Sequence, residues 1–262
     1  MPFAFCLASL PTVAPAKVSM ASERLAFIDA AVNDAIGRGQ TPGAVVLVAR
    51  RGGVVWRKAY GSRALIPARE AMTADTVFDL ASLTKVVATA TSVMILVERG
   101  KVRLGDPVSL YIPELKGEGR EKVTIEHLLT HRSGYAPDFD LGEQWAGYDE
   151  MLKHLYVEPL RSAPGARFVY SDINYITLGE VVRRASGETL DVFARRNIFE
   201  PLGMKDTGFR SSRPGPAPTA GYSPSEAAQV ARIAPTENVR GMRSYLGGSG
   251  ESSTAGEVML RG

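Results

Sequence analysis

One short stretch of the chain combines a nucleophile and a base at a spacing that suits a helix. Residues 78–100 read FDLASLTKVVATATSVMILVERG and contain a Ser-x-x-Lys sequence, with Ser82 three residues before Lys85. Residues at this spacing lie on one face of a helix, one turn apart. Burial lowers the pKa of a lysine, so Lys85 could accept the proton of a serine hydroxyl. The stretch therefore predicts a covalent nucleophile at Ser82 with Lys85 as its base.

The residues after Ser82 predict the helix that would carry this pair. Apolar side chains from Leu83 to Val97 cover most of its circumference, which is typical of a helix packed on all sides. Gly100 stands where a left-handed backbone is needed beyond the helix end. A serine at the helix start lies among free N–H groups, which stabilise developing negative charge. A plainer interpretation is also open, in which Ser82 only caps the helix and Lys85 extends to solvent.

A second segment, Phe168-Val169-Tyr170-Ser171-Asp172, supplies a further group that can carry a proton. It follows the turn at Pro164-Gly165 and precedes a helix that we predict over 174–185. A phenol and an ammonium in contact titrate as a pair, so Tyr170 could share a proton with Lys85 and help to activate Ser82. The alternative is a buried tyrosine whose hydroxyl bonds to the backbone.

Four segments of the chain together resemble the serine β-lactamase and penicillin-binding-protein superfamily, in its class C and family VIII esterase branch. They are FDLASLTK at 78–85, IEHLLTHRSG at 125–134, PGARFVYSDINY at 164–175 and FEPLGMKDTGF at 199–209. The resemblance implies that Ser82 is acylated, and that Lys85 and Tyr170 form the base that also protonates the leaving group. The class A pattern fits less well, because its Ser-Asp-Asn element would place Asn at position 173, where the chain has Ile.

The resemblance also implies a fold, an α+β architecture of the β-lactamase/transpeptidase type. Its antiparallel sheet is flanked by helices, and a mostly helical subdomain is expected at about 102–200. The expected domain spans 22–262 and is incomplete, with the C-terminal strands missing. We further expect a helix from Ser22 to about Gly37, with Ser22 as its cap. The 43–61 segment predicts a β-hairpin that packs on the Ser82 helix, with Val45 to Val48 covered on both faces.

The chain departs from the family pattern at two places. The family's Tyr-x-Asn is Tyr170-Ser171-Asp172 here, and a carboxylate at this substrate-binding position accepts hydrogen bonds but cannot donate them. Asp172 would also favour a charged Lys85, which opposes its role as a base and shifts the expected substrate from β-lactams towards esters. The third motif, a Lys, His or Trp followed by x-Gly, has no convincing match, and Gly247 to Gly250 lacks both the residue type and a strand pattern. We therefore expect a C-terminally truncated hydrolase without its second oxyanion donor.

The expected reaction is the hydrolysis of a small ester or amide, such as a β-lactam or a peptide, with no metal or organic cofactor. A different class of function is also open, a non-catalytic binder of peptidoglycan or regulator, or an inactive fragment. Residues 1–21 resemble a leader or signal segment without a basic start, which favours export to the periplasm or medium over the cytoplasm. The oligomeric state is not predicted.

Bulk composition and further motifs exclude several other classes. The 262 residues carry a net charge of +3 without a basic stripe, which argues against nucleic-acid binding, and no stretch is apolar enough for a transmembrane segment. The single cysteine, Cys6, excludes an internal disulfide. His127 and His131 have the spacing of zinc ligands, but the glutamate of His-Glu-x-x-His is absent and a scaffold role is favoured. No Gly-x-Ser-x-Gly occurs, which disfavours an α/β-hydrolase.

Overall fold

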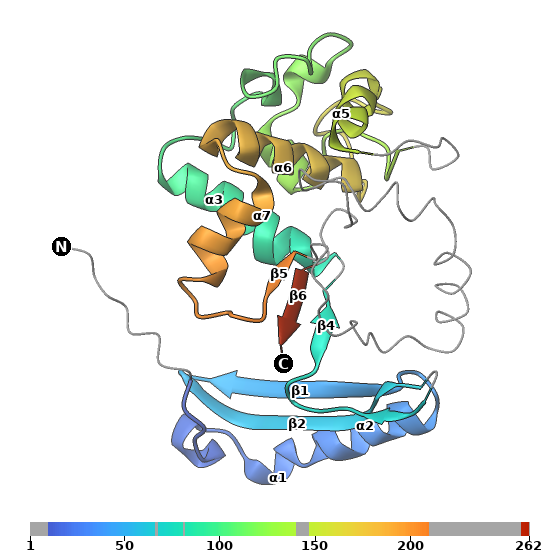
Figure 1. Ribbon diagram of the computed structural model, residues 1–262, viewed down its shortest axis with the longest axis vertical. Coiled ribbons are helices and arrows are strands. Elements are labelled where there is room, and N and C mark those ends of the chain that lie inside the picture. The colour runs from blue at the N-terminus through green and yellow to red at the C-terminus, as the bar shows by residue number, and fades with distance from the viewer. Residues whose placement is uncertain (1–9, 66–67, 81, 140–146, 210–257, 262) are drawn as a thin grey trace, which may run out of the picture. The chain divides into compact units, whose positions relative to one another are not determined.

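A computed structural model describes residues 10–65, 68–80, 82–139, 147–209 and 258–261 (Figure 1). The chain divides into two compact units, and the main boundary falls between Asp79 and Leu80. The first unit contains a 3-10 helix η1 (Pro15–Val18), helices α1 (Ser22–Leu25) and α2 (Phe27–Gly37), and strands β1 (Gly43–Arg50), β2 (Gly53–Ala64), β3 (Glu70–Ala71) and β4 (Val77–Asp79). The predicted subdomain at about 102–200 stays a prediction.

The predicted β-hairpin is present as strands β1 and β2, which pair antiparallel from Gly43↔Gly61 to Arg50↔Gly53. The turn consists of Arg51 and Gly52, both with positive φ, so it has the twist that suits a two-residue hairpin loop. The expectation that β1 is covered on both faces is wrong. Leu47 is exposed and the neighbouring valines are only half-buried. Burial of these side chains depends on which elements pack on the faces of the sheet, which the apolar sequence alone does not determine.

The N-terminal helix begins at Ser22 as expected, but its boundaries differ in detail. Ala21 occupies the cap position, no side chain caps the helix, and a break at Ala26 separates α1 from α2. α2 is tied to β2 by Asp29, whose Oδ1 accepts hydrogen bonds from Tyr60 (2.8 Å) and Lys58 (2.7 Å). The helix therefore covers the hairpin within the first unit.

The second unit is mainly helical and has its own core. Its elements are η2 (Lys85–Ala90, π-helical), α3 (Thr91–Glu98), the 3-10 turns η3 (Val108–Leu110) and η4 (Arg120–Lys122), α4 (Ile125–Leu129), α5 (Tyr148–Val157), α6 (Asp172–Ser186), α7 (Leu190–Ala194), η5 (Arg195–Phe199, π-helical) and strand β5 (Gly208–Phe209). Strand β6 (Val258–Arg261) pairs with β5 through Gly208↔Met259 and Phe209↔Val258. No pattern in the sequence predicts β6. None of the helices in the described ranges is long and apolar enough to cross a membrane.

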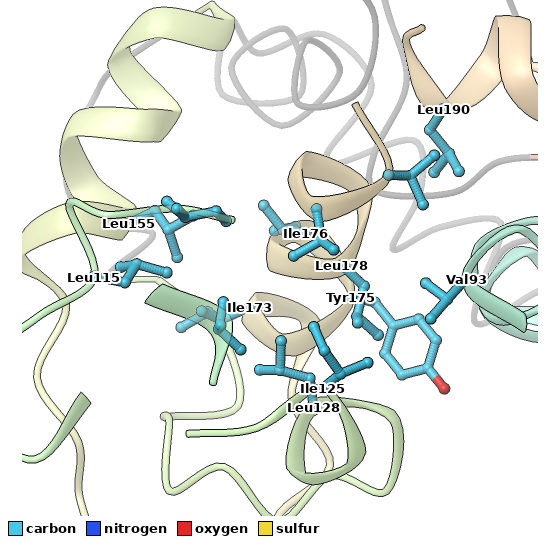
Figure 2. Close-up of a cluster of buried hydrophobic side chains, with 14 of the residues drawn as sticks. Val93, Leu115, Ile125, Leu128, Leu155, Ile173, Tyr175, Ile176, Leu178 and Leu190 are labelled. Carbon is cyan, nitrogen blue, oxygen red and sulfur yellow. The ribbon is translucent and has the colours of Figure 1, made fainter. Parts of the chain in front are cut away.

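Helix α6 runs through the centre of this core (Figure 2). Its residues from Ile173 to Val182 are all buried, and Gly187 ends it with φ 79°. The side chains around it come from α3, α4, α5 and α7 and include Val93, Leu128, Leu155 and Leu190. A helix buried on every side has little freedom to shift, so the start of α6 at Asp172 has a well-defined position.

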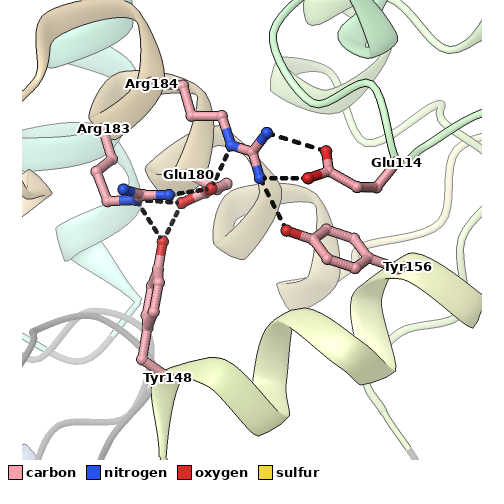
Figure 3. A network of polar contacts seen from close by, with 6 residues as sticks. All are labelled: Glu114, Tyr148, Tyr156, Glu180, Arg183 and Arg184. Carbon is pink, nitrogen blue, oxygen red and sulfur yellow. Dashed lines mark hydrogen bonds and ion pairs between the residues drawn. The ribbon is translucent and has the colours of Figure 1, made fainter.

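A buried polar network fixes the other end of α6 (Figure 3). The carboxylate of Glu180 is fully buried and forms ion pairs with Arg183 (2.7 Å) and Arg184 (2.6 Å). The Tyr148 hydroxyl also donates to Glu180. Arg184 forms a second ion pair, with Glu114, at 2.9 Å. Burial alone would raise the pKa of Glu180, but these donors outweigh it and hold the pKa below its usual value. The network joins Tyr148 of α5, and Glu114 in the segment between η3 and η4, to helix α6.

The helix after Ser82 forms as predicted but is not buried on all sides. Its inner face carries Ala88, Val93 and Leu96, whereas Leu83, Val86 and Met94 are exposed. The circumference is apolar in the sequence, yet the helices of the second unit contact only one face of it. The predicted packing of the hairpin on this helix stays a prediction.

Candidate active site

Lys85 is the centre of a cluster that contains all four sequence-predicted site residues. Its Nζ donates a hydrogen bond to Ser82 Oγ at 3.1 Å and lies 2.6 Å from Asp172 Oδ1. The Tyr170 ring centroid is 5.1 Å from Nζ, and the phenol contributes to the raised pKa of Lys85. Ser82 and Tyr170 therefore both lie next to Lys85.

Two segments distant in sequence position this cluster. Ser82 precedes the first helical turn, and its carbonyl accepts a hydrogen bond from the Lys85 N–H at 3.1 Å. The π-helical segment η2 begins at Lys85 itself, and such segments are frequent at functional sites. On the other side Ser171 is the N-cap of α6 and Asp172 is its first residue, which brings a carboxylate to the positive end of the helix.

Burial differs sharply among the four side chains. The Lys85 side chain is 6% exposed, the Asp172 side chain is 35% exposed and Tyr170 is 47% exposed. Ser82 is also exposed. The Oδ1 atom of Asp172 that faces Lys85 is itself buried, so the exposed part of this side chain lies elsewhere on the carboxyl group. The ammonium is thus interior, whereas the hydroxyl and the phenol are open to a substrate.

The electrostatics keep Lys85 charged in the resting site. Burial alone would lower the pKa of Lys85, but hydrogen bonds to Asp172 and Tyr170, with their charges, raise it above the usual value. Asp172 thus favours the charged form of Lys85, as the sequence analysis predicts. A charged Lys85 donates to Ser82 and cannot accept from it, so the ammonium has to lose a proton before it can act as a base.

A carboxylate that the sequence analysis missed lies close to this site. Asp138 is half-buried, and burial together with the negative charge of Asp172 raises its pKa, whereas the charge of Lys85 lowers it. Its segment is held against α6, because the Asp172 N–H donates to the Pro137 carbonyl at 2.7 Å. No local pattern in the sequence marks Asp138, since its nearness to Lys85 depends on the tertiary fold.

The two histidines of the zinc alternative have other partners. His127 forms a capping box with Thr124, whose N–H donates to His127 Nδ1 at 3.3 Å. His131 Nδ1 accepts from the Ser171 N–H at 3.1 Å. In the part of the chain that the structure describes, no three His, Cys, Asp or Glu side chains gather as metal ligands would. The region of Gly247 to Gly250, considered for the third motif, lies outside the described residues.

This fold and site define a class of protein, the β-lactamase-related serine hydrolases and penicillin-binding proteins. Residues 28–259 match the Beta-lactamase family, and the chain belongs to it. The α+β fold of the β-lactamase/transpeptidase type is confirmed by similarity to the crystal structure of a class C β-lactamase, at 26% identity and a TM-score of 0.64. The match covers 76% of this chain and 53% of that chain.

Two curated relatives show the range of activities in the family. Esterase EstB of Burkholderia gladioli is 37% identical over 223 residues, which cover 74% of this chain and 54% of the relative. An N-acetylmuramyl-L-alanine amidase of Bacillus subtilis (strain 168) is 30% identical over 237 residues, which cover 83% of this chain and 52% of the relative. The chain thus spans about half the length of the curated relatives it matches.

Proposed function

We propose that this chain carries the nucleophile and the proton-transfer groups of a serine hydrolase that forms an acyl-enzyme at Ser82. The observation that supports the proposal most is the 3.1 Å hydrogen bond between Lys85 Nζ and Ser82 Oγ, in a lysine that also contacts Tyr170. Nucleophile and base within hydrogen-bond reach, with a third group that orients the base, is the usual arrangement for an activated serine.

The reaction proceeds in two acyl transfers. Once the Lys85 ammonium has released a proton to solvent, Ser82 Oγ attacks the substrate carbonyl carbon while its own proton passes to the Lys85–Tyr170 pair. The same pair then returns that proton to the leaving alcohol or amine. A water molecule then attacks the ester on Ser82, gives a proton to the pair and releases the acid, and the serine is restored. One molecule of water is consumed for each bond that is broken.

A small ester is the proposed substrate, with an amide or a β-lactam as the second choice. The carboxylate of Asp172 accepts hydrogen bonds only and cannot copy the amide that donates to a β-lactam side chain. An ester also has a better leaving group than an amide, so it depends less on a strong base, which suits a charged Lys85. The relative named Esterase EstB supports the same choice.

A non-catalytic peptidoglycan binder is the competing function, and the ion pair between Asp172 and Lys85 favours it. That ion pair keeps the lysine protonated and so opposes the activation of Ser82. A binder would retain the site residues but would form no covalent product.

The test compares turnover of p-nitrophenyl acetate with that of a chromogenic cephalosporin, for the wild-type chain and for Ser82→Ala. We expect ester hydrolysis that is lost in Ser82→Ala, with slower or absent lactam hydrolysis. Faster hydrolysis of the lactam would overturn the ester assignment. If neither substrate is turned over and fluorescent penicillin leaves no covalent label, the binder is favoured over the hydrolase.

A further inference from the structure

The backbone on both sides of Tyr170 is hydrogen-bonded to one residue, His131. The N–H of Val169 donates to the His131 carbonyl at 2.9 Å. The N–H of Ser171 donates to the His131 ring nitrogen Nδ1 at 3.1 Å. Tyr170 lies between these two anchors, so the position of its side chain depends on where His131 lies.

The rings of His131 and Tyr170 are also in direct contact. Their centroids are 4.5 Å apart with an interplanar angle of 32°, and the Tyr175 ring lies 5.0 Å from His131 at 34°. His131 is only 9% exposed, whereas Tyr170 is 47% exposed. The buried His131 ring therefore packs against the more exposed Tyr170 ring, and rings attract at this separation.

The hydrogen bonds around His131 define its protonation state. Asn174 Oδ1 accepts a hydrogen bond from the Ser133 hydroxyl at 2.5 Å, which turns the amide nitrogen of Asn174 towards His131 Nδ1 at 3.3 Å. The Ser171 N–H points at the same atom. Two donors directed at Nδ1 leave no room for a proton on it, so His131 is neutral with its proton on Nε2.

The backbone of His131 is itself in an unusual conformation. Its φ of 55° is left-handed, which few residues other than glycine adopt. This conformation directs both the carbonyl and the ring of His131 to the 169–171 segment. The carbonyl, Nδ1 and ring of His131 thus all contact the 169–171 segment from one residue that the fold holds in a defined geometry.

We infer that neutral His131 is a positioning residue for Tyr170, and that a proton on its Nδ1 releases the Ser171 N–H and slows acylation of Ser82. The inference rests on the proposed function, because it assumes that Tyr170 takes part in proton transfer to or from Ser82. His131 does not touch the reacting atoms. His131 acts indirectly, by holding the Tyr170 phenol in position.

The charges around His131 determine the pH at which its Nδ1 becomes protonated. Burial and the positive charge of Lys85 lower the pKa of His131 below its usual 6.5, and the negative charge of Asp172 opposes them. The other titratable groups that face the ring are the phenols of Tyr170 and Tyr175. His131 is therefore neutral at neutral pH and becomes protonated only as the pH falls below 6.5.

Two substitutions separate the hydrogen bond from the rest of the residue. In His131→Asn the side-chain Oδ1 stands in the place of Nδ1, cannot be protonated in this pH range, and suits a left-handed backbone. His131→Ala removes both acceptor and ring. His154→Gln is the matched control, a histidine on α5 that the site does not use. The readout is the rate of covalent labelling by a fluorophosphonate between about pH 5 and pH 8.

We expect wild-type labelling to fall with acid below the usual histidine pKa, and His154→Gln to behave in the same way. His131→Ala should label about tenfold or more slowly at neutral pH, since a misplaced proton-transfer group costs at least that factor. His131→Asn should recover part of the loss and keep only the acid decline that the protonation of Lys85 causes, without the additional fall that the wild type shows below the usual histidine pKa. An acid decline that persists unchanged in His131→Asn, or wild-type labelling of His131→Ala, would overturn the inference.

Nitrogen NMR of the three histidine rings gives a readout that needs no activity. We expect His131, assigned by its absence in His131→Asn, to carry its proton on Nε2 and to titrate below 6.5. A proton on Nδ1 at neutral pH would overturn the inference directly. Absence of labelling at every pH would instead count against the proposed function, and the NMR result would still decide how His131 is bonded.

Discussion

Lys85 and Asp172 form an ion pair, with 2.6 Å between Nζ and Oδ1, from two segments far apart in the sequence. The lysine is almost fully buried and the carboxylate is partly open to solvent. An ion pair of this kind stabilises the protonated lysine next to the serine that it is proposed to activate. The chemistry of the site therefore depends on how firmly Asp172 holds that proton.

Replacing Asp172 by asparagine should make Lys85 a better base. Without the carboxylate, the largest effect that opposes burial is lost and the pKa of Lys85 falls. Each pKa unit raises the neutral fraction at a fixed pH about tenfold. We expect Asp172→Asn to label faster with fluorophosphonate at neutral pH and to reach its maximal rate at lower pH. Asp149→Asn, at an exposed position of α5, is the matched control. A slower rate in Asp172→Asn would mean that the carboxylate assists acylation.

Removing the Tyr170 hydroxyl should reduce acylation while the fold is retained. Tyr170→Phe keeps the ring on His131 but loses the contact with Lys85, and loss of a positioned proton-transfer group costs roughly 10²–10⁴ in rate. Tyr175→Phe is the matched control, because the Tyr175 hydroxyl donates to the Leu129 carbonyl at 3.1 Å. The control should lose about 1 kcal/mol of unfolding free energy and keep its labelling rate. Equal labelling rates in the two variants would exclude a role for the Tyr170 hydroxyl.

The stability of the helical unit should depend on Glu180. Glu180→Ala leaves Arg183 and Arg184 without their buried partner, and we expect a loss of about 3 kcal/mol in urea unfolding at neutral pH. The loss should be smaller in Glu180→Gln, which can still accept hydrogen bonds. Glu126→Gln, on the exposed side of α4, should change little. An unfolding free energy of Glu180→Ala equal to that of the wild type would show that the network contributes nothing.

The network around Glu180 also predicts how the unfolding free energy changes as the pH falls. The pKa of Glu180 is lower in the folded state than its usual 4.5, so the unfolded chain binds the proton first as the pH falls. This part of the stability is complete above pH 4.5 and disappears as the pH falls through the folded-state pKa. Urea unfolding of wild type and Glu180→Gln as a function of pH should therefore converge in acid, and parallel curves would contradict this assignment.

Local signals in the sequence predicted the elements that depend on local chemistry. The hairpin predicted at 43–61 and the helix predicted over 174–185 are both present, because each depends on a few neighbouring residues. Which faces those elements bury was predicted less well. Leu47 and Val86 are exposed although their segments are apolar, since burial depends on which other elements pack there.

Within the site, the sequence predicted the four residues that carry family motifs but missed those that support them. His131 was considered as a zinc ligand or as scaffold, and its contact with Tyr170 was not predicted. Its hydrogen bond to Ser171 joins residues 40 positions apart, and Asp138 likewise approaches Lys85 only in the folded chain. A left-handed histidine gives no pattern in the sequence, so only the tertiary structure shows this role.

The central claim is that Ser82 is an activated nucleophile, and intact-mass analysis after fluorophosphonate treatment tests it most directly. We expect one covalent adduct per chain, on the peptide that contains Ser82, and no adduct in Ser82→Ala. The variant should fold like the wild type, because Ser82 is exposed and loses only the hydrogen bond from Lys85. An adduct that survives in Ser82→Ala, or the complete absence of an adduct in the folded wild-type chain, would contradict the claim.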